Sequence, residues 1–472
     1  ANQAAREAKS QYLLFLNNDT EVFPGTITSA LNTIEGSNDI GVVGGKLILP
    51  DGTLQEAGGI LWRDGSCLGY GRGDDPFAPA YMFSRDIDYC SGAFLLTRRK
   101  LFKEIRGFDE AFRPAYYEDT DYCLRVWEGG YRVVYDPDAI VLHHEFASTP
   151  SAKDAIDLQA AHQQVFIEKH AERLENHLIR SDKDVIKART CHRNQPRVLY
   201  LDDRVPHPAL GSGYPRSHTI LDRLSARKYF ITLYPLAVLD ESWTSVYADI
   251  PRDMEVMSGF GAAGLETFLE ERPGYYDIVV VSRPHNMRVM NLVIRAHPDW
   301  FRRTVILYDA EAISTEREVQ RRQLRGEMVS EAEHQTMLRN ELQLASFSDS
   351  VISVSEAERT TFLGHGLDRV FELGHVLSIS PSTSGFNDRS GLLFVGSIFG
   401  DMTSNADAIV WFVEDIFPRI RKILGSDVVL SVTGHNESEK VCQLASKHVR
   451  ILGAIEDLSE LYEQNRVFIA PS

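Results

Sequence analysis

Short apolar runs separated by polar, turn-rich segments recur along the first 145 residues of this chain. Alternation and β-branched content predict strands or extended segments at 12–16, 41–43, 94–96, 131–135 and 139–143. Helices are expected at 102–105 and 119–128, and Gly129-Gly130 is a typical C-terminal stop for the second of them. This mixture predicts an α/β domain.

A more regular rhythm of strand, loop and helix starts at residue 197. Apolar, β-branched runs recur at 198–201, 278–281, 305–308, 351–354, 392–395, 428–432, 449–452 and 467–469. Helix-compatible segments lie between most of them, which is typical of parallel α/β units. A capping box at Ser355 and Glu358 predicts one helix start, and the charged stretch 314–346 is expected to be helical.

Composition shifts divide the chain into four parts. We expect a first domain at 1–150, a polar helical linker at 151–195, and two lobes of a second domain at 196–388 and 389–472. The break after the linker is expected at 193–196, and a Ser/Pro/Gly-rich connector at 380–389 separates the lobes. The chain begins in a helical pattern and ends on an apolar strand, so we expect it to be an internal fragment of a longer protein.

Composition and charge argue against a membrane-spanning protein and against a nucleic-acid-binding one. The 472 residues are 43% apolar and 25% charged, which is ordinary for a soluble globular protein. No run approaches the roughly 18 apolar residues that a transmembrane helix needs. The net charge of −17 argues against a nucleic-acid partner. The five cysteines form no CxxC pair, so we expect a cytoplasmic protein, with peripheral contact to the inner face of the plasma membrane left open.

Two acidic motifs carry the candidate chemistry. The apolar run 12–16 ends at Asn17-Asn18-Asp19, an arrangement that presents a hard oxygen ligand to a divalent cation. About a hundred residues later, Glu118, Asp119 and Asp121 form a cluster in which one carboxylate could act as a general base. Together the motifs indicate chemistry on a metal-bound diphosphate.

The order of these pieces resembles the family 2 glycosyltransferases, especially the rhamnosyltransferase-like branch with a GT-A fold. The matching text includes residues 12–22, Pro24-Gly25, 51–59, 88–93, 107–110, 117–121, Arg125, Pro137 and His143. The resemblance covers only the second half of such a domain. It implies a nucleotide-diphosphate sugar as donor and a glycan or lipid-linked glycan as acceptor.

The resemblance also implies roles for individual residues. Asp19 would ligate Mg²⁺ or Mn²⁺ in place of the family's DxD motif, and Asn17 and Asn18 would contact the donor. His143, rather than the adjacent His144, would supply a further contact to the metal or the diphosphate. Asp119 would be the base that activates the acceptor, with Glu118 beside it, and Gly92 would let the sugar approach. Base and metal on opposite sides of the anomeric carbon would imply in-line displacement with inversion, with one carboxylate base and no covalent intermediate.

Residues 197–472 resemble a family 4 glycosyltransferase with the two Rossmann-like lobes of a GT-B fold. The matching text includes 198–203, 211–213, 392–397, 405–408, 411–413, 432–434 and 468–472. By resemblance, Gly211 and Gly213 are candidates at the acceptor side, and Gly396 and Gly434 are candidate donor-site residues. The resemblance implies transfer without a metal, in a second lobe that is truncated here.

Each motif also has a structural interpretation. Asn-Asn-Asp-Thr is an ordinary turn sequence, acids favour the first turn of any helix, and Asp121 with Arg125 fits a structural i,i+4 pair. The glycines fit tight turns. At the level of function, the leading prediction is a tandem glycosyltransferase of bacterial surface polysaccharide or O-antigen-like synthesis.

Two other functions stay open. The basic pair that family 4 enzymes place after the second-lobe glycine loop has no match in 397–405. The second domain could therefore be a non-catalytic acceptor-binding or scaffold module. A nucleotidyltransferase or sugar-nucleotide epimerase is the other alternative, although the chain lacks the GxxGxxG and YxxxK arrangement of an epimerase.

Overall fold

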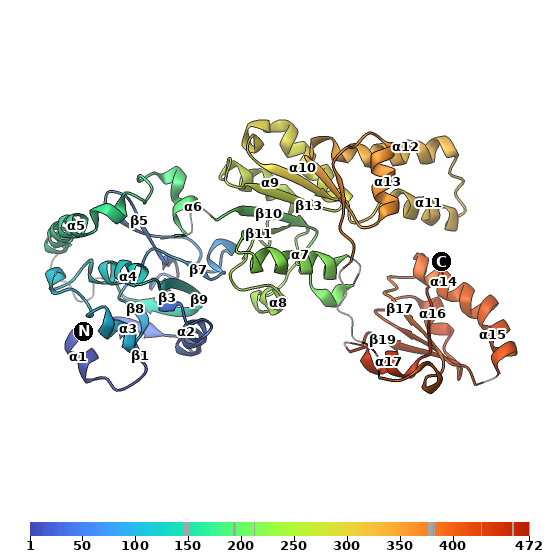
Figure 1. Ribbon diagram of the computed structural model, residues 1–472, viewed down its shortest axis with the longest axis horizontal. Coiled ribbons are helices and arrows are strands. Elements are labelled where there is room, and N and C mark those ends of the chain that lie inside the picture. Colours follow the sequence, from blue (N-terminus) through green and yellow to red (C-terminus); the bar gives the residue numbers. More distant parts are fainter. Residues whose placement is uncertain are drawn as a thin grey trace. The chain divides into compact units, whose positions relative to one another are not determined.

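The computed structural model describes residues 1–145, 152–191, 195–211, 213–375, 381, 383–425, 427–455 and 457–471. It is an α/β protein with parallel sheets in its second half, as the sequence predicts (Figure 1). By its internal contacts the chain divides into unit 1, with residues 1–205, 222–279 and 293–305, and unit 2, with residues 206–221, 280–292 and 306–472. Parts of the predicted break at 193–196 and of the connector at 380–389 lie outside the described residues.

A seven-stranded mixed sheet forms the first body of unit 1. Its strands follow the order β1 (Tyr12–Leu16), β8 (Phe94–Arg98), β3 (Ile40–Ile48), β9 (Arg132–His143) and β2 (Thr20–Val22), with β4 (Leu54–Ala57) on β3 and β7 (Arg85–Asp86) on β9. A short hairpin joins β5 (Gly59–Leu61) to β6 (Cys67–Gly69). The helices are α1 (Asn2–Glu7), α2 (Thr26–Glu35), α3 (Arg99–Glu104), α4 (Glu118–Glu128), α5 (Ala152–Leu174) and α6 (Val185–Ala188).

The central strand β3 is buried along its whole length and extends well beyond the predicted 41–43. Its glycines allow close packing rather than turns. A Cβ atom added at Gly44 would lie 2.2 Å from the Cβ of Cys90, and one at Gly45 would lie 2.5 Å from the Ala139 carbonyl oxygen. The strand therefore continues through a segment that looks like a turn in the sequence.

Strand β9 joins the two extended segments predicted on either side of Pro137. Its parallel register with β3 shifts between Gly44 and Lys46, where Tyr135 and Ile140 are the respective partners. Such an irregularity accommodates a proline that cannot donate a ladder hydrogen bond. The strand ends at His143, which is the last predicted site residue of the first domain in the sequence.

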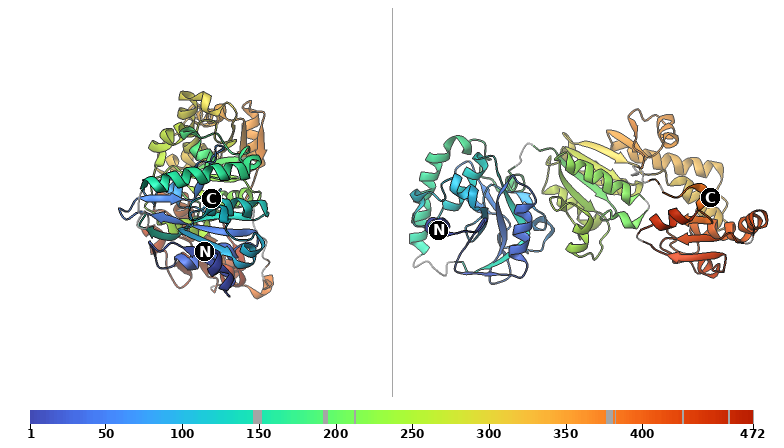
Figure 2. Two further views of the ribbon diagram at one scale, coloured as in Figure 1. Left: turned by 90° about the vertical axis from the view of Figure 1, so that its left-hand side faces the viewer. Right: turned by 60° about the horizontal axis from the view of Figure 1, so that its bottom comes forward.

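Helix α5 packs against the first body, within the segment predicted as a linker (Figure 2). Phe166 is fully buried in a cluster with Phe112, Tyr117 and Leu174. The Phe166 ring lies 5.1 Å from the Tyr117 ring, and His162 Nδ1 lies 2.9 Å from the Ala115 carbonyl oxygen. The helix therefore supports the segment that leads into α4.

A second seven-stranded sheet follows along the chain. Its order is β12 (Glu255–Val256), β11 (Phe230–Pro235), β10 (Arg197–Asp202), β13 (Ile278–Ser282), β14 (Val305–Asp309), β15 (Ser350–Ser353) and β16 (Val370–Glu372). The pairings β10–β11, β11–β12, β14–β15 and β15–β16 are parallel. Its helices are α7 (Tyr214–Ala226), α8 (Trp243–Asp249), α9 (Gly261–Glu270), α10 (Pro284–Ala296), α11 (Thr315–Leu324), α12 (Glu331–Leu342) and α13 (Glu356–Gly364).

The predicted capping box is half formed at the start of α13. The Ser355 side chain accepts from the Glu358 backbone N–H, as predicted. The Glu358 carboxylate instead accepts from the Ile313 N–H at 2.8 Å, which holds the loop after β14.

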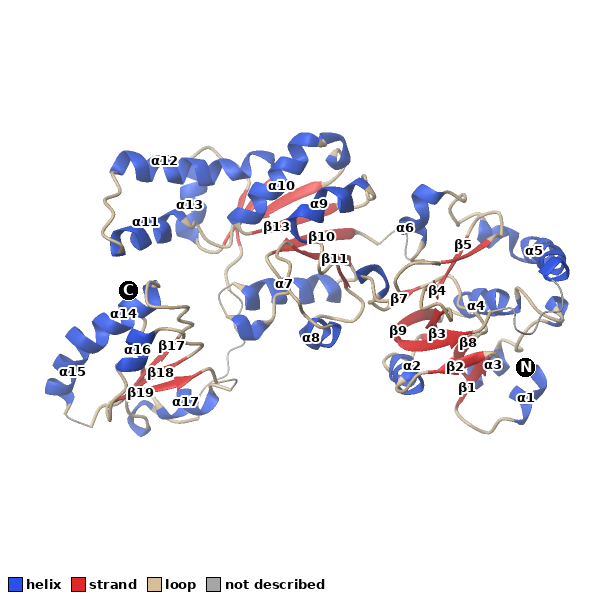
Figure 3. Cartoon of the chain, turned by 180° about the vertical axis from the view of Figure 1, so that it is seen from behind, coloured by secondary structure: helices blue, strands red, loops and turns tan. Residues whose placement is uncertain are grey.

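A four-stranded sheet closes the described chain (Figure 3). Its parallel order is β19 (Val449–Gly453), β18 (Leu430–Thr433), β17 (Leu392–Val395) and β20 (Val467–Phe468). The accompanying helices are α14 (Ser404–Trp411), α15 (Phe417–Leu424), α16 (Glu439–Gln443) and α17 (Ser459–Gln464). None of the helices within the described ranges combines the length and apolarity that crossing a membrane requires.

Candidate active site

A tight backbone turn delivers the acid pair at the start of α4. Tyr116 and Tyr117 both adopt left-handed conformations, with φ of 75° and 70°. Such conformations are unfavourable for bulky residues and persist only where surrounding contacts impose them. Tyr117 is buried, and its hydroxyl donates to the Gly65 carbonyl at 3.0 Å. The turn places Glu118 and Asp119 in the first turn of the helix.

Backbone amides anchor the carboxylate of Asp119. Its Oδ2 accepts from the Gly92 N–H at 2.8 Å, and its Oδ1 accepts from the Thr120 N–H at 2.7 Å. Burial raises the pKa of Asp119, and the hydrogen bonds from Gly92 and Thr120 oppose that rise. These bonds stabilise the ionised form.

The Glu118 carboxylate accepts no hydrogen bond from another residue in the described ranges. Its Oε2 is buried and has no hydrogen-bond partner among the described residues. Burial and the neighbouring charge of Asp119 raise the pKa of Glu118 to about 8. Burial thus favours the protonated form of Glu118, whereas the hydrogen bonds from Gly92 and Thr120 favour the ionised form of Asp119.

Glu118 and Asp119 line a cavity of about 550 Å³ in unit 1. Asn17 and Gly92 line the same cavity, together with Phe108 and the strand β1. Asn17 is tied to this edge because its N–H donates to the Ala93 carbonyl at 3.2 Å. Asn18 is exposed and does not line the cavity. The fold thus brings together four of the predicted site residues.

Strand pairing brings Asp19 and His143 side by side. In the antiparallel register of β2 and β9, Thr20 lies opposite His143, which sets the preceding Asp19 next to the imidazole. Asp19 Oδ1 lies 3.3 Å from His143 Nε2. This oxygen is buried and accepts no hydrogen bond among the described residues. The adjacent His144 points elsewhere, with Nε2 2.8 Å from Glu21 Oε1.

These two side chains fit a shared divalent cation. Ligand atoms about 2.1 Å from one ion and at right angles to each other lie about 3 Å apart, close to the observed separation. Within the described ranges, no group of three or more His, Cys, Asp and Glu side chains is arranged to hold a metal. The remaining ligands would therefore come from water or a bound phosphate.

Two residues of the region were not predicted as site residues. Buried Glu56 accepts from the Ser91 N–H at 3.2 Å, one residue before the amide that holds Asp119, and burial raises its pKa to about 7. Buried Gln55 lies with its Oε1 2.8 Å from His143 Nδ1. Both come from β4, and no periodicity in the sequence marks them. Their only signal is that they fall inside the family-like text at 51–59.

A buried charge network supports the far side of α4. Asp121 is fully buried and lies 2.6 Å from Arg125 Nη2, 2.6 Å from Lys169 Nζ and 2.8 Å from His170 Nε2. Burial raises the pKa of Asp121, but these contacts outweigh it and hold the pKa below its usual value. The predicted Asp121–Arg125 pair is formed.

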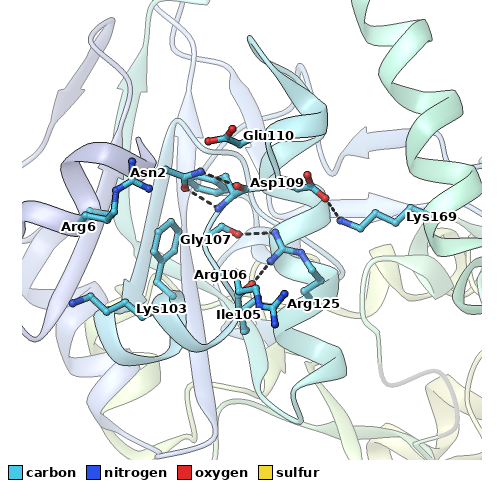
Figure 4. Close-up of a pocket in the computed structure, with 13 residues that line it drawn as sticks. Asn2, Arg6, Lys103, Ile105, Arg106, Gly107, Asp109, Glu110, Arg125 and Lys169 are labelled. Carbon is cyan, nitrogen blue, oxygen red and sulfur yellow. Dashed lines mark hydrogen bonds and ion pairs between the residues drawn. The ribbon is translucent and has the colours of Figure 1, made fainter.

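The charge network around Asp121 extends to the wall of a pocket beside α3. It measures about 610 Å³, and Arg125 reaches across one of its walls to donate to the carbonyls of Ile105 and Gly107 (Figure 4). Lys169 also contacts Asp109 at this wall. Arg125 and Lys169 therefore tie α4 both to the loop after α3 and to α5.

Three of the four predicted glycines of unit 2 occupy tightly packed positions. Gly396 and Gly434 follow the paired strands β17 and β18, and a Cβ atom on Gly434 would lie 2.2 Å from the Gly396 carbonyl oxygen. A Cβ atom on Gly213 would lie 2.1 Å from Glu311 Oε1, and Gly211 has a φ of 66°. Close approach of other atoms explains Gly213, Gly396 and Gly434, and the left-handed backbone explains Gly211. The donor and acceptor roles of all four stay predictions.

Charged side chains near the ends of β13 and β14 were not predicted. Arg283 and Glu311 form an ion pair at 3.2 Å, and both adopt left-handed conformations with φ of 78° and 56°. Arg216 donates to Asp309 at 2.6 Å. The sequence offers no local signal for these pairs, because each joins residues far apart in the chain.

Comparison with known families agrees with this geometry. Residues 1–106 match the family model of glycosyl transferase family 2, and residues 389–472 match that of glycosyl transferases group 1. Both regions are thus glycosyltransferase regions, and the predicted resemblance at the two ends of the chain is confirmed.

Curated relatives match smaller parts of the chain. The O-antigen biosynthesis protein RfbC of Myxococcus xanthus is 34% identical over 153 residues, which are 31% of this chain and 12% of that protein. The N-acetylglucosaminyl-diphospho-decaprenol L-rhamnosyltransferase of Mycobacterium tuberculosis is 30% identical over 178 residues, 35% of this chain and 57% of that protein. Rhamnosyltransferase WbbL of Escherichia coli is 38% identical over 58 residues, 12% of this chain and 22% of that protein. The chain thus spans about half or less of each of these relatives.

Proposed function

We propose that the first region transfers a sugar from a nucleoside diphosphate to a glycan hydroxyl in a metal-dependent, inverting reaction. The observation that carries the proposal is the cavity shared by Asn17, Gly92, Glu118 and Asp119. It joins an anchored carboxylate to the end of β1, where the residues predicted to contact the donor begin. The family 2 match over residues 1–106 supports the same class of reaction.

Asp119 is the general base in this proposal. It accepts the acceptor's hydroxyl proton as the oxygen attacks the anomeric carbon and the bond to the diphosphate breaks. The hydrogen bonds from Gly92 and Thr120 keep its carboxylate ionised and oriented. Glu118, with its pKa raised to about 8, holds a proton at neutral pH and so spares Asp119 a second adjacent charge. A single base on one side of the anomeric carbon corresponds to inversion.

Asp19 and His143 are the proposed holders of Mn²⁺ or Mg²⁺. The cation would supply positive charge to neutralise the leaving diphosphate. The buried Asp19 oxygen without a hydrogen bond and its 3.3 Å separation from the imidazole support this assignment. An imidazole ligand favours Mn²⁺ over Mg²⁺. Asn17 and Asn18 remain the proposed donor contacts at the end of β1.

The proposed substrates follow from the names of the relatives. Two of them are rhamnosyltransferases and one is an O-antigen biosynthesis protein. We therefore assign a deoxyhexose such as rhamnose as the sugar and a lipid-linked glycan as the acceptor, in the synthesis of a bacterial surface polysaccharide. We propose that the reaction takes place at the inner face of the plasma membrane.

The second region is proposed to bind a nucleotide sugar without a metal. The group 1 match over residues 389–472 and the contact between Gly396 and Gly434 at adjacent strand ends support a donor site there. Gly211 and Gly213 are the proposed acceptor-side residues.

The test is release of nucleoside diphosphate by the full-length protein, using a panel of nucleotide sugars with Mn²⁺ or with EDTA. The proposal expects release that requires the metal and that disappears in Asp19→Ala. Release that continues unchanged in EDTA and in Asp19→Ala would contradict a metal-dependent first site. Metal-independent turnover that persists in Asp119→Asn would assign activity to the second region and exclude the scaffold alternative.

A further inference from the structure

A chain of polar side chains runs from the protein surface to the proposed metal ligands. Its members are Arg72, Glu145, Gln55, His143 and Asp19, in that order. Gln55 and His143 are buried, whereas Arg72 and Glu145 lie nearer the solvent. Every contact in this series joins residues that are distant in the sequence, so the series exists only in the folded protein.

The outer part of this chain determines how the Gln55 amide is oriented. Arg72 forms an ion pair with Glu145, and its Nη1 donates to Glu145 Oε1 at 3.2 Å. The carboxylate of Glu145 accepts hydrogen bonds but cannot donate them. Gln55 therefore turns its NH₂ group towards Glu145, with Nε2 3.4 Å from Oε1. The amide oxygen is left facing the imidazole.

The amide oxygen in turn determines the tautomer of His143. Gln55 Oε1 lies 2.8 Å from His143 Nδ1, and an amide oxygen only accepts. In the neutral ring Nδ1 must therefore carry the proton, which leaves the lone pair of Nε2 directed towards Asp19 Oδ1. The 3.3 Å contact between those two atoms is not a hydrogen bond in this geometry, and both atoms are acceptors. Two acceptors facing each other in a buried site suit a cation between them.

We infer that Gln55 is a positioning residue that holds His143 in the Nδ1-protonated tautomer and so keeps Nε2 available to a divalent cation shared with Asp19. The inference rests on the proposed metal-dependent function. Without the Gln55 oxygen, Nε2 would carry the proton and donate it to Asp19, and both ligand atoms would be occupied. Partners behind a metal-ligating histidine typically contribute 10- to 100-fold in metal affinity.

The tautomer can be measured in the metal-free protein. The full chain labelled with ¹⁵N-histidine would be studied by long-range ¹H–¹⁵N NMR at about pH 8, above the ordinary pKa of histidine. The His143 signals would be assigned by their loss in His143→Ala. We expect a proton on Nδ1 in the wild type and a shift towards Nε2 protonation in Gln55→Leu. A wild-type His143 protonated on Nε2 would overturn the inference.

Metal binding gives a second, independent measurement. Binding of Mn²⁺, alone and with inorganic pyrophosphate, would be followed by electron paramagnetic resonance. We expect Gln55→Leu to weaken the binding about 10-fold or more. Gln164→Leu is the matched control, because Gln164 lies on the exposed face of α5 and, among the described residues, bonds only within that helix, to Glu168. Equal Mn²⁺ affinity and an equal tautomer in Gln55→Leu and the wild type would contradict the role of Gln55.

A separate result would indicate failure of the proposed function itself. If Asp19→Ala bound Mn²⁺ as tightly as the wild type, the cation site would lie elsewhere and the inference about its ligands would fall with it. Loss of binding in Asp19→Ala, with unchanged binding in Gln55→Leu, would overturn only the positioning role.

Discussion

The Gly92 backbone N–H donates to Asp119 Oδ2 at 2.8 Å, and this bond ties the start of α4 to the loop that precedes β8. The preceding amide, that of Ser91, donates to Glu56. Successive amides of one loop therefore hold two different buried carboxylates. The position of the proposed base depends on this loop as much as on its own helix.

Asp119→Asn should remove the proposed base and leave the fold intact. An asparagine oxygen can still accept from the Gly92 N–H, but the amide cannot take a proton from the acceptor. We expect nucleoside diphosphate release in the presence of acceptor to fall about 10²- to 10⁴-fold. The new NH₂ group faces the Thr120 N–H in place of a carboxylate oxygen, so the melting temperature should fall slightly. Asp64→Asn is the control, since that exposed carboxylate bonds only to Ser66 in a local turn and should retain full activity. A small effect of Asp119→Asn on the metal-dependent release would point to another base in the first region.

Glu118→Gln should change how stability depends on pH. Because folding raises the pKa of Glu118 from about 4.5 to about 8, the folded state retains a proton that the unfolded state releases between these values. Its stabilising contribution is complete below about pH 4.5 and is lost as the pH rises through about 8. Glutamine cannot ionise, so the melting temperature of Glu118→Gln relative to the wild type should increase across this window. The slope cannot exceed about 1.4 kcal/mol per pH unit. A constant difference would mean that Glu118 titrates normally in the folded protein.

Phe166→Ala should destabilise the first body although Phe166 lies in a segment with the sequence character of a linker. The ring is fully buried against Tyr117 and Phe112, so its removal leaves a cavity. Truncations of this kind cost about 3–5 kcal/mol. Denaturant unfolding would measure the loss, with the neighbouring, more exposed Val165→Ala expected to change stability by less than about 1 kcal/mol. Equal effects at the two positions would show that α5 is not packed in solution.

Glu255→Gln should test a buried ion pair in unit 1. Both side chains are fully buried, with Arg189 Nη1 2.8 Å from Glu255 Oε1 and Nη2 2.9 Å from Oε2. Removing the negative charge leaves a buried guanidinium without its counter-ion, which typically costs about 3–5 kcal/mol. The exposed pair of Glu266 with His297 offers a matched control, and Glu266→Gln should cost less than about 1 kcal/mol. Similar losses for both variants would contradict the burial of the first pair.

Local patterns in the sequence predicted some strands with their exact bounds, but they missed one strand and shortened another. The apolar runs at 12–16 and 392–395 coincide with β1 and β17. The strand Phe230–Pro235 was missed, although all six residues are buried and its β-branched residues offered a signal. Strand β3 was predicted too short because three of its residues are glycines, which resemble a turn in the sequence. In the fold these glycines allow close packing with residues far along the chain.

The sequence predicted candidate site residues of the first region only within the segments that resemble family 2 glycosyltransferases. That text contains Asp19, His143 and Asp119, and the fold places the first two in contact and the third in the cavity with Gly92. Gln55 could not be assigned its role, because the orientation of its amide depends on Glu145, which reaches it through the pairing of distant strands. Tautomers and shared protons are properties of such contacts and have no counterpart in a local pattern.

The packing of α5 sets a lower limit on the smallest form of the first body that can fold alone. Lys169 and His170 are two of the three basic side chains that contact buried Asp121, and Phe166 fills part of the core. Buried Ala188 adds a further contact beyond that helix. A protein cut near residue 150, where the sequence suggests a domain end, would leave a carboxylate buried beside a single arginine. An autonomous catalytic fragment should therefore extend at least to Ala188.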